Sequence, residues 1–227
     1  FLYDTYDAMA RDNRTRILPL DSPRGLIRDR NGNILADSRT AYAVSFIPQN
    51  IGDSSGIIEQ LSEILGMSEQ EIEEKIAAQR SRPYVPVRIK SDVSTDVIVS
   101  IEERRLDLPG VIVEDIWIRQ YPHGNAASLL LGYIGPASSG DLKRLAGRDY
   151  REGDLVGKSG IEYAYETELR GIDGKKEVEV DAYSWPIRTT GYSPVIPGND
   201  VVLTIDIELQ KFVEKALEEQ IEYVRTH

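Results

Sequence analysis

The hydrophobic residues of this 227-residue chain change their spacing several times, from the period of a β-strand to that of an α-helix and back. Asn31-Gly32 separates two extended runs, 26–29 and 34–36, and Asn-Gly in this setting is a strong signal for a β-hairpin. Alternation over 41–47 predicts a half-buried strand, whereas Ile57 to Leu65 follow helical spacing. The pattern predicts an α+β fold with antiparallel strands and hairpins.

The remaining segments continue this mixture. Ser68 to Glu71 form a capping-box sequence that predicts the start of a second short helix, carrying Ile72 and Ile76 on its apolar side. Asp206 is placed to cap a final helix with one apolar stripe. Strands are predicted over 15–20, 84–89, 111–118, 176–182, 186–192 and 201–205, and further helices over 2–13, 93–104, 122–130, 141–146 and 159–169.

Composition excludes several kinds of site. The chain has 27 basic and 38 acidic side chains, a formal charge of -11, which argues against a nucleic-acid partner. It has no cysteine, so thiolate catalysis, cysteine–zinc sites, iron–sulfur clusters and disulfides are excluded. An imidazole site would depend on His123, since His227 is terminal, and His123 is predicted to be a turn residue. We therefore predict no catalytic residue, metal or cofactor.

Lys158 is the residue on which an enzymatic reading would depend. Gly157-Lys158-Ser159 resembles part of a phosphate-binding loop, but that loop needs a glycine where Glu152 stands. The same lysine could serve a nucleotide- or glycan-processing domain together with nearby carboxylates, which is the rival hypothesis. A serine acyl-enzyme mechanism would need a serine followed three residues later by lysine, and the sequence contains no such pair.

A series of motifs nevertheless resembles one family. Residues 24–36, reading RGLIRDRNGNILA, resemble the opening motif of class B penicillin-binding proteins. The family's later motifs follow in order at 108–111, 121–124, 131–135, 157–162, 169–171 and 203–206. Tyr165-Glu166, with Gly153-Asp154 ahead of the Gly-Lys pair, most resembles elongation-type members, and a division-type member is the alternative. Ser128 departs from the family, whose members often carry histidine there.

The resemblance implies a non-catalytic pedestal, or dimerisation module, in which an anchor region contains an inserted mixed α/β head. The implied boundaries are 1–50 and 136–205 for the anchor, 51–135 for the head, and 206–227 for a helix leading to a transpeptidase domain that this chain lacks. The chain starts without methionine and ends within a helical pattern, so we expect it to be a fragment. The full-length protein is expected to be a penicillin-sensitive serine D,D-transpeptidase, anchored by one membrane helix on the extracytoplasmic face.

Partners and site residues also follow from the resemblance. The pedestal is expected to contact a RodA-like SEDS polymerase and an MreC-like scaffold protein, and could form a homodimer. Two amphipathic helices would offer a docking seam at Ile57, Ile58, Leu61, Ile72 and Ile76, although ordinary core packing is the simpler interpretation. Structural motif roles are predicted for Arg24, Gly25, Asp29, Arg30, Gly32, Gly157, Lys158, Gly160, Glu162, Arg170 and Gly171. Among these, charged contacts between the hairpin and the helix after Lys158 are expected to fix the shape of the pedestal.

Overall fold

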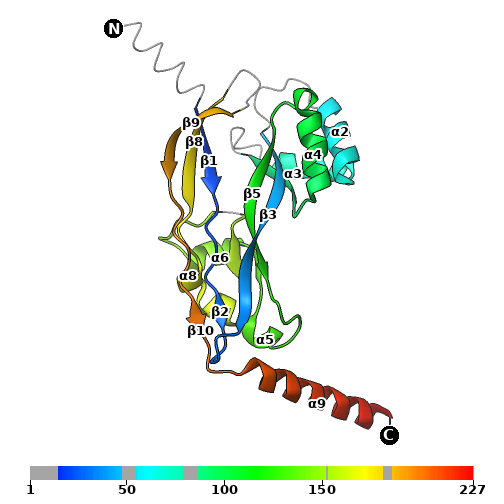
Figure 1. Ribbon diagram of the computed structural model, residues 1–227, viewed down its shortest axis with the longest axis vertical. Coiled ribbons are helices and arrows are strands. Elements are labelled where there is room, and N and C mark those ends of the chain that lie inside the picture. Colours follow the sequence, from blue (N-terminus) through cyan, green and yellow to red (C-terminus); the bar gives the residue numbers. More distant parts are fainter. Residues whose placement is uncertain (1–14, 48–54, 79–85, 152, 181–185, 227) are drawn as a thin grey trace, which may run out of the picture. The chain divides into compact units, whose positions relative to one another are not determined.

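The computed structural model describes residues 15–47, 55–78, 86–151, 153–180 and 186–226 (Figure 1). These residues combine helices with antiparallel and mixed sheets, so the predicted α+β class is confirmed. They divide into two compact units: unit 1 takes the described residues within 15–21, 40–118 and 173–195, and unit 2 those within 22–39, 119–172 and 196–226. The helix predicted over 2–13 lies outside the described residues. The anchor and head boundaries stay a prediction.

Unit 1 contains a three-stranded antiparallel sheet. Its order is β1 (Thr15–Leu20), β8 (Gly174–Val180) and β9 (Pro186–Ser193). Thr15 pairs with Glu179 and Leu20 with Gly174, which fixes the register of β1 on β8. Val178 and Val180 are buried, whereas the residue before each of them is more accessible to solvent, as the two-residue period of a strand requires.

The helices of unit 1 pack around a second group of strands. They are α2 (Ser55–Leu65), α3 (Glu69–Ala78), α4 (Thr95–Glu103) and the 3-10 turn Arg105–Asp107; the strands are β4 (Val87–Ser91), β5 (Val111–Gln120) and the later part of β3 (Ile34–Phe46). The predicted capping box is confirmed: the Ser68 amide donates to Glu71 Oε2 (2.9 Å) and the Glu71 amide donates to Ser68 Oγ (3.3 Å). Phe46, Leu61, Leu65, Ile72 and Ile89 are among the members of one buried apolar cluster.

Unit 2 is built around the predicted hairpin. β2 (Ile27–Arg28) pairs antiparallel with the start of β3, Gly32 has φ +87° in the turn between them, and β10 (Val201–Val202) joins β2 in parallel. The unit also contains α5 (Ser128–Leu131), β6 (Ile134–Pro136), α6 (Ser139–Arg144), β7 (Leu155–Gly157), α7 (Gly160–Ala164) and α8 (Glu166–Leu169). Ile27, Leu35, Leu131, Leu169 and Ile207 pack together in its core.

Two predicted helices of unit 2 are shorter or broken. The helix expected over 159–169 is interrupted at Tyr165, whose φ of -109° and ψ of 27° separate α7 from α8. The helix expected over 122–130 appears only as α5, because Ala127 adopts a left-handed conformation (φ +57°) directly before it. In both places the backbone of one residue leaves the helical conformation, and a helix begins or ends there although the apolar spacing continues.

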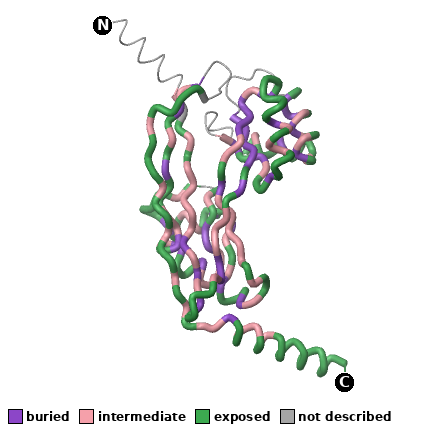
Figure 2. The backbone as a smooth tube through the Cα atoms, in the orientation of Figure 1, coloured by how far each residue is buried: buried purple, intermediate pink, exposed green. Residues whose placement is uncertain are grey.

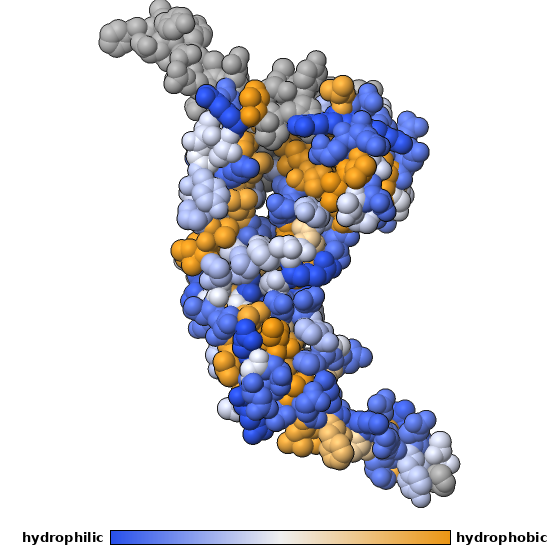
Figure 3. Space-filling view, in the orientation of Figure 1, coloured by the Kyte–Doolittle hydropathy of each residue, from blue (hydrophilic) through white to orange (hydrophobic). Residues whose placement is uncertain are grey.

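The last helix, α9 (Ile207–Thr226), is exposed over most of its length (Figure 2), and its exposed residues include an apolar stripe. Asp206 caps it as predicted, since Oδ1 accepts hydrogen bonds from the amides of Glu208 (3.1 Å) and Leu209 (3.2 Å). Ile207 is buried, but Leu209, Phe212, Val213, Leu217, Ile221 and Val224 are between 44% and 71% exposed. Apolar side chains are visible where α9 begins (Figure 3). Of the helices that the structure describes, none is long and apolar enough to span a bilayer.

Candidate functional site

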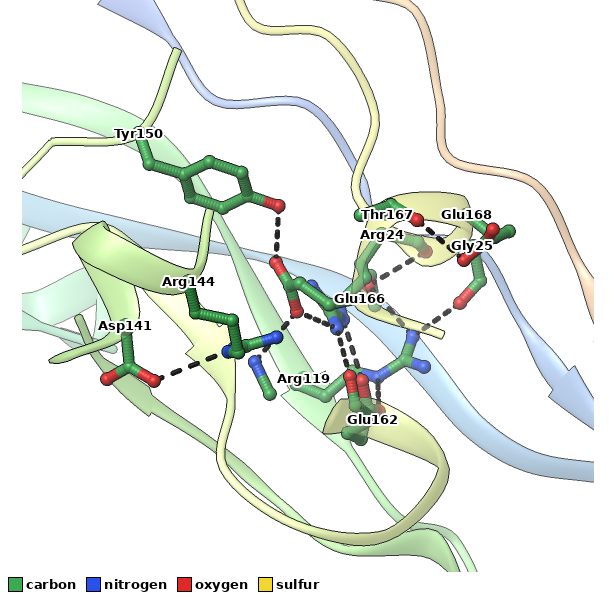
Figure 4. Close-up of polar contacts among 12 residues, drawn as sticks. Arg24, Gly25, Arg119, Asp141, Arg144, Tyr150, Glu162, Glu166, Thr167 and Glu168 are labelled. Carbon is green, nitrogen blue, oxygen red and sulfur yellow. Dashed lines mark hydrogen bonds and ion pairs between the residues drawn. The ribbon is translucent and has the colours of Figure 1, made fainter. Parts of the chain in front are cut away.

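Four buried or nearly buried charges form an arginine–glutamate cluster in unit 2, consisting of Arg24, Arg119, Glu162 and Glu166 (Figure 4). Arg24 precedes β2, Arg119 lies near the end of β5, and the glutamates belong to α7 and α8. The side chains of Arg119, Glu162 and Glu166 are at most 2% exposed, and that of Arg24 is 10% exposed. Two positive and two negative charges therefore balance in a site with little access to water.

Arg24 joins the two short helices. Its Nε donates to Glu162 Oε2 (2.7 Å) and its Nη2 donates to Glu166 Oε2 (2.6 Å). Burial alone would lower the pKa of Arg24, but the hydrogen bond to Glu166 and the charges of both glutamates outweigh burial and raise it. The guanidinium therefore stays charged, and its fork fixes α7 relative to α8 on either side of the break at Tyr165.

Arg119 completes the cluster by binding the carboxylate oxygen of Glu162 that Arg24 does not bind. Its Nε donates to Glu162 Oε1 (2.7 Å), and its Nη1 donates to the carbonyl oxygen of Gly25 (2.7 Å). Its Nη2 is buried and has no hydrogen-bond partner among the described residues. Glu162 thus accepts from an arginine at each of its oxygens.

Both carboxylate oxygens of Glu166 also accept hydrogen bonds. Besides Arg24, its Oε2 accepts the amide of Gly157 (2.7 Å), and its Oε1 accepts the Tyr150 hydroxyl (2.8 Å). A carboxylate that accepts hydrogen bonds at both oxygens, one of them from a guanidinium, is held in one orientation. The site therefore links chain segments that are distant in sequence.

Two further ion pairs surround the cluster. Arg170 donates from Nη2 to Asp154 Oδ2 (3.0 Å), and its guanidinium lies 3.8 Å from the centre of the Tyr150 ring. Lys158 Nζ donates to Asp141 Oδ2 (2.6 Å), and this hydrogen bond is the main reason why the pKa of Asp141 lies well below its usual range. The ammonium on which the enzymatic hypothesis depended thus has a carboxylate partner from α6.

Asp29 and Arg30 do not reach the cluster. The Asp29 side chain is buried in the hairpin turn, where it accepts the amides of Asn31 (2.9 Å) and Asn33 (2.8 Å) at Oδ1. Burial would raise the pKa of Asp29, but the hydrogen bonds from Asn33, Ile207 and Asn31 lower it to about 2. Arg30 is exposed, and its amide donates to the carbonyl oxygen of Ile205 (3.0 Å). Of the charged residues predicted to meet, the structure joins Arg24 to Glu162 and pairs Arg170 with Asp154.

The predicted glycines differ in what they do. Gly32 has open space around it, and the turn needs it for its positive φ. At the other four positions, a β-carbon would meet backbone atoms: 1.9 Å from Asn199 O at Gly25, 1.9 Å from Glu162 O at Gly157, 2.3 Å from Leu130 O at Gly160 and 2.1 Å from Ile196 O at Gly171. These glycines allow close crossing of backbone segments in unit 2.

The residues predicted for partner docking lie within unit 1. Ile57 and Ile58 are 6% exposed, and Leu61 and Ile72 are fully buried in the apolar cluster of that unit. Ile76 is partly buried and packs against the same cluster. In this conformation four of the five side chains face the core, and their docking role stays a prediction.

Sequence reasoning missed Arg119, Tyr121 and Tyr150 and gave Glu166 no structural role. Arg119 is 43 residues from Glu162, and Arg24 is 142 residues from Glu166, so no local spacing connects them. Arg119 follows an apolar strand, which is a weak signal for a buried charge. Among the described residues, no group of three or more histidine, aspartate or glutamate side chains could hold a metal ion.

Two tyrosines donate to the glutamates of the cluster, Tyr150 to Glu166 and Tyr121 to Glu162 Oε1 (3.4 Å), and they predict an alkaline loss of stability. Burial, and then the charge of the neighbouring glutamate, raises the pKa of Tyr150 to about 12, and burial with Glu162 does the same for Tyr121. The pKa of the Tyr150 phenol is higher in the folded state than its ordinary value of 10.0, so the protonated phenol stabilises the fold fully below pH 10. This stabilisation is lost as pH rises towards 12. Thermal unfolding from pH 9 to 12, with phenolate absorbance at 295 nm, measures the effect.

Tyr150→Phe should flatten the decline of the unfolding temperature with pH, whereas Tyr192→Phe, at an exposed site, should not. Equal declines in both variants would contradict the prediction.

Comparison with known proteins identifies a family. Residues 19–203 match the family described as the penicillin-binding protein dimerisation domain. The peptidoglycan D,D-transpeptidase MrdA of Acinetobacter baumannii is 33% identical over 96% of this chain, and MrdA of Haemophilus influenzae is 31% identical over 95%. These alignments cover 32% and 34% of the two relatives, so the chain spans about a third of their length.

A solved structure shows the same fold. The complex between penicillin-binding protein PBP2 and MreC from Helicobacter pylori aligns with a TM-score of 0.68 and 25% identity, covering 90% of this chain and 38% of that one. Because the family match extends over most of the chain and includes every residue of the arginine–glutamate cluster, the chain belongs to the penicillin-binding protein dimerisation domain family. It is similar to the pedestal region of MrdA-like peptidoglycan transpeptidases.

Proposed function

We propose that this chain is the pedestal of an elongation-type peptidoglycan D,D-transpeptidase and acts in bacterial cell-wall synthesis and cell shape. The observation that carries the proposal is the match of residues 19–203 to the dimerisation domain, together with relatives named MrdA over more than nine-tenths of the chain. The proposed location is the extracytoplasmic face of the membrane. In this role the chain holds and positions a transpeptidase domain and performs no reaction itself.

The architecture of unit 2 supports a positioning role. The charges of its arginine–glutamate cluster bind one another and backbone groups from distant segments, which favours one arrangement of the segments over alternatives. The exposed apolar stripe of α9 lies beyond residue 203, where the family match ends. We propose that a transpeptidase domain covers this stripe, since an exposed apolar surface of this extent is typical of an interface.

Partner docking is proposed for the head of the pedestal, residues 51–135. The PBP2 structure that shares this fold is a complex with MreC, and we propose an MreC-like scaffold protein as a partner here. A RodA-like SEDS polymerase is proposed as a second partner, and homodimer formation is proposed as a further association for sedimentation velocity to test. The docking seam would form where α2 and α3 separate and expose side chains that now face the core.

Titration of the chain with the extracytoplasmic domain of MreC from the same source tests the docking proposal. We expect saturable binding by calorimetry, weakened at least about tenfold by Ile76→Glu, since a charge in an apolar contact costs more than about 1.4 kcal/mol. Ile76 is the best reporter of the five predicted docking residues because it is the least buried, so its substitution perturbs the core least.

Ala77→Glu is the matched control, because it places the same charge one residue further along α3 at an exposed position. Both variants must unfold at temperatures close to that of the unaltered chain for the comparison to stand. Binding that Ile76→Glu and Ala77→Glu leave equally strong would contradict the seam, and absence of binding by the unaltered chain would contradict MreC docking to this pedestal.

A further inference from the structure

The start of α9 is tied to the turn of the β2–β3 hairpin, more than 170 residues earlier in the chain. The amide of Ile207 donates to Asp29 Oδ2 (3.1 Å), and the Asn31 side-chain amide donates to Asp206 Oδ2 (2.9 Å). The amide of Arg30 also donates to the carbonyl oxygen of Ile205 (3.0 Å). Three hydrogen bonds from one turn thus hold the residues at which the helix begins.

The carboxylate of Asp29 is itself held firmly. Oδ1 accepts the amides of Asn31 and Asn33, and Oδ2 accepts the side-chain amide of Asn33 (3.0 Å) as well as the amide of Ile207. The side chain has no exposed surface, so rotation would break several buried hydrogen bonds together. The first turn of α9 is therefore attached to a rigid group.

A second attachment lies two turns further along the helix. Glu214 Oε1 accepts the amide of Ala127 (2.9 Å) and the side-chain amide of Gln210 (2.8 Å). Ala127 is 3% exposed and adopts a left-handed conformation directly before α5. Residues 207 and 214 are about 10 Å apart along the axis, and two fixed points at that separation define the direction of a helix.

We propose that Asp29 and Glu214 are positioning residues that fix the direction of α9, making the helix a rigid extension of unit 2. Beyond Glu214 the helix continues to Thr226 with its apolar stripe exposed. The significance of a fixed direction rests on the proposed function, because a pedestal can orient a following domain only through a connection that does not bend freely. The rigidity itself is a property of this chain and is measured without any partner.

Electron spin resonance can test the direction of α9 on the chain itself. The sequence has no cysteine, so Lys143→Cys on α6 and Glu222→Cys on α9 introduce two unique nitroxide sites, both exposed and both in unit 2. We expect one narrow distance distribution. Glu214→Ala should broaden and shift it, because tilting a helix of 20 residues by about 10° moves its far end by about 5 Å.

Two substitutions serve as matched controls. Glu214→Gln keeps an oxygen acceptor for the Ala127 amide and should restore the narrow distribution, and Glu218→Ala, at an exposed position of the same helix, should leave it unchanged. Far-UV circular dichroism checks that α9 stays helical. A broad distribution in the chain with Glu214 intact, or one that Glu214→Ala does not alter, overturns the proposal. Either result leaves the MreC titration unaffected, so failure of one proposal is distinguishable from failure of the other.

Discussion

Glu162→Gln is expected to lower the free energy of unfolding by about 3 to 5 kcal/mol, because it leaves a net positive charge in a buried site. Glu162 accepts hydrogen bonds from both Arg24 and Arg119, and its side chain has no exposed surface. The substitution keeps the shape of the side chain and one oxygen acceptor. The loss therefore reports on charge balance and not on packing, and denaturant unfolding followed by circular dichroism measures it.

Glu168→Gln provides the control for this substitution. Glu168 lies in α8, close in sequence to Glu162, but it is exposed, and its carboxylate accepts a hydrogen bond from Thr167. We expect its substitution to change stability by less than about 0.5 kcal/mol. If the two variants are equally stable, the arginine–glutamate cluster does not hold unit 2 together.

Gly25→Ala is expected to destabilise the chain by about 3 kcal/mol or to prevent unit 2 from folding, because the added methyl group has no space. Its β-carbon would lie 1.9 Å from the carbonyl oxygen of Asn199. Hydrogen bonds fix the segments that cross there: the Gly25 amide donates to Leu169 O (2.9 Å) and the Gly198 amide donates to Pro23 O (3.0 Å). Because the obstacle is backbone, no side-chain rotation can relieve the clash.

Gly56→Ala is the control for Gly25→Ala, because it adds the same methyl group at a position where no backbone lies close by. Gly56 lies in α2 and is exposed, and a methyl group added there would have no neighbouring atom within 4 Å. Alanine at this position should stabilise the helix by up to about 1 kcal/mol, since glycine has the greater conformational entropy to lose. Thermal unfolding of both variants gives the comparison. A Gly25→Ala variant as stable as Gly56→Ala would show that the crossing at Asn199 can open without cost.

Local chemistry accounts for the elements that were predicted well. The hairpin at Asn31-Gly32, the capping box at Ser68 and the cap at Asp206 each depend on residues within a few positions of one another. Turn and cap geometries of this kind are nearly complete without the rest of the fold. The helix α2 likewise follows the spacing of its own apolar residues, and the strands β1 and β9 were predicted to within one or two positions at their ends.

The helices around the cluster show where local reasoning stops. The predicted single helix over 159–169 is two helices, and Arg24 binds a glutamate from each of them. Glu162 and Glu166 are four residues apart, a spacing that places side chains on the same face of a helix, but nothing in the local sequence indicates that the distant Arg24 is their common partner. The non-helical dihedral angles of Tyr165 are a feature of the tertiary structure that the apolar spacing of 159–169 does not contain.

The sequence by itself determined the α+β class, the hairpin, the caps and, through its ordered motifs, the family to which the chain belongs. Only the tertiary structure decided that Arg119 and Glu166 complete the cluster around Arg24 and Glu162, and that Asp29 serves the start of α9 instead. The physical reason is distance along the chain. A charge is buried only where an opposite charge or a set of hydrogen-bond donors from another segment meets it, and those encounters are fixed by the fold as a whole and not by neighbouring residues.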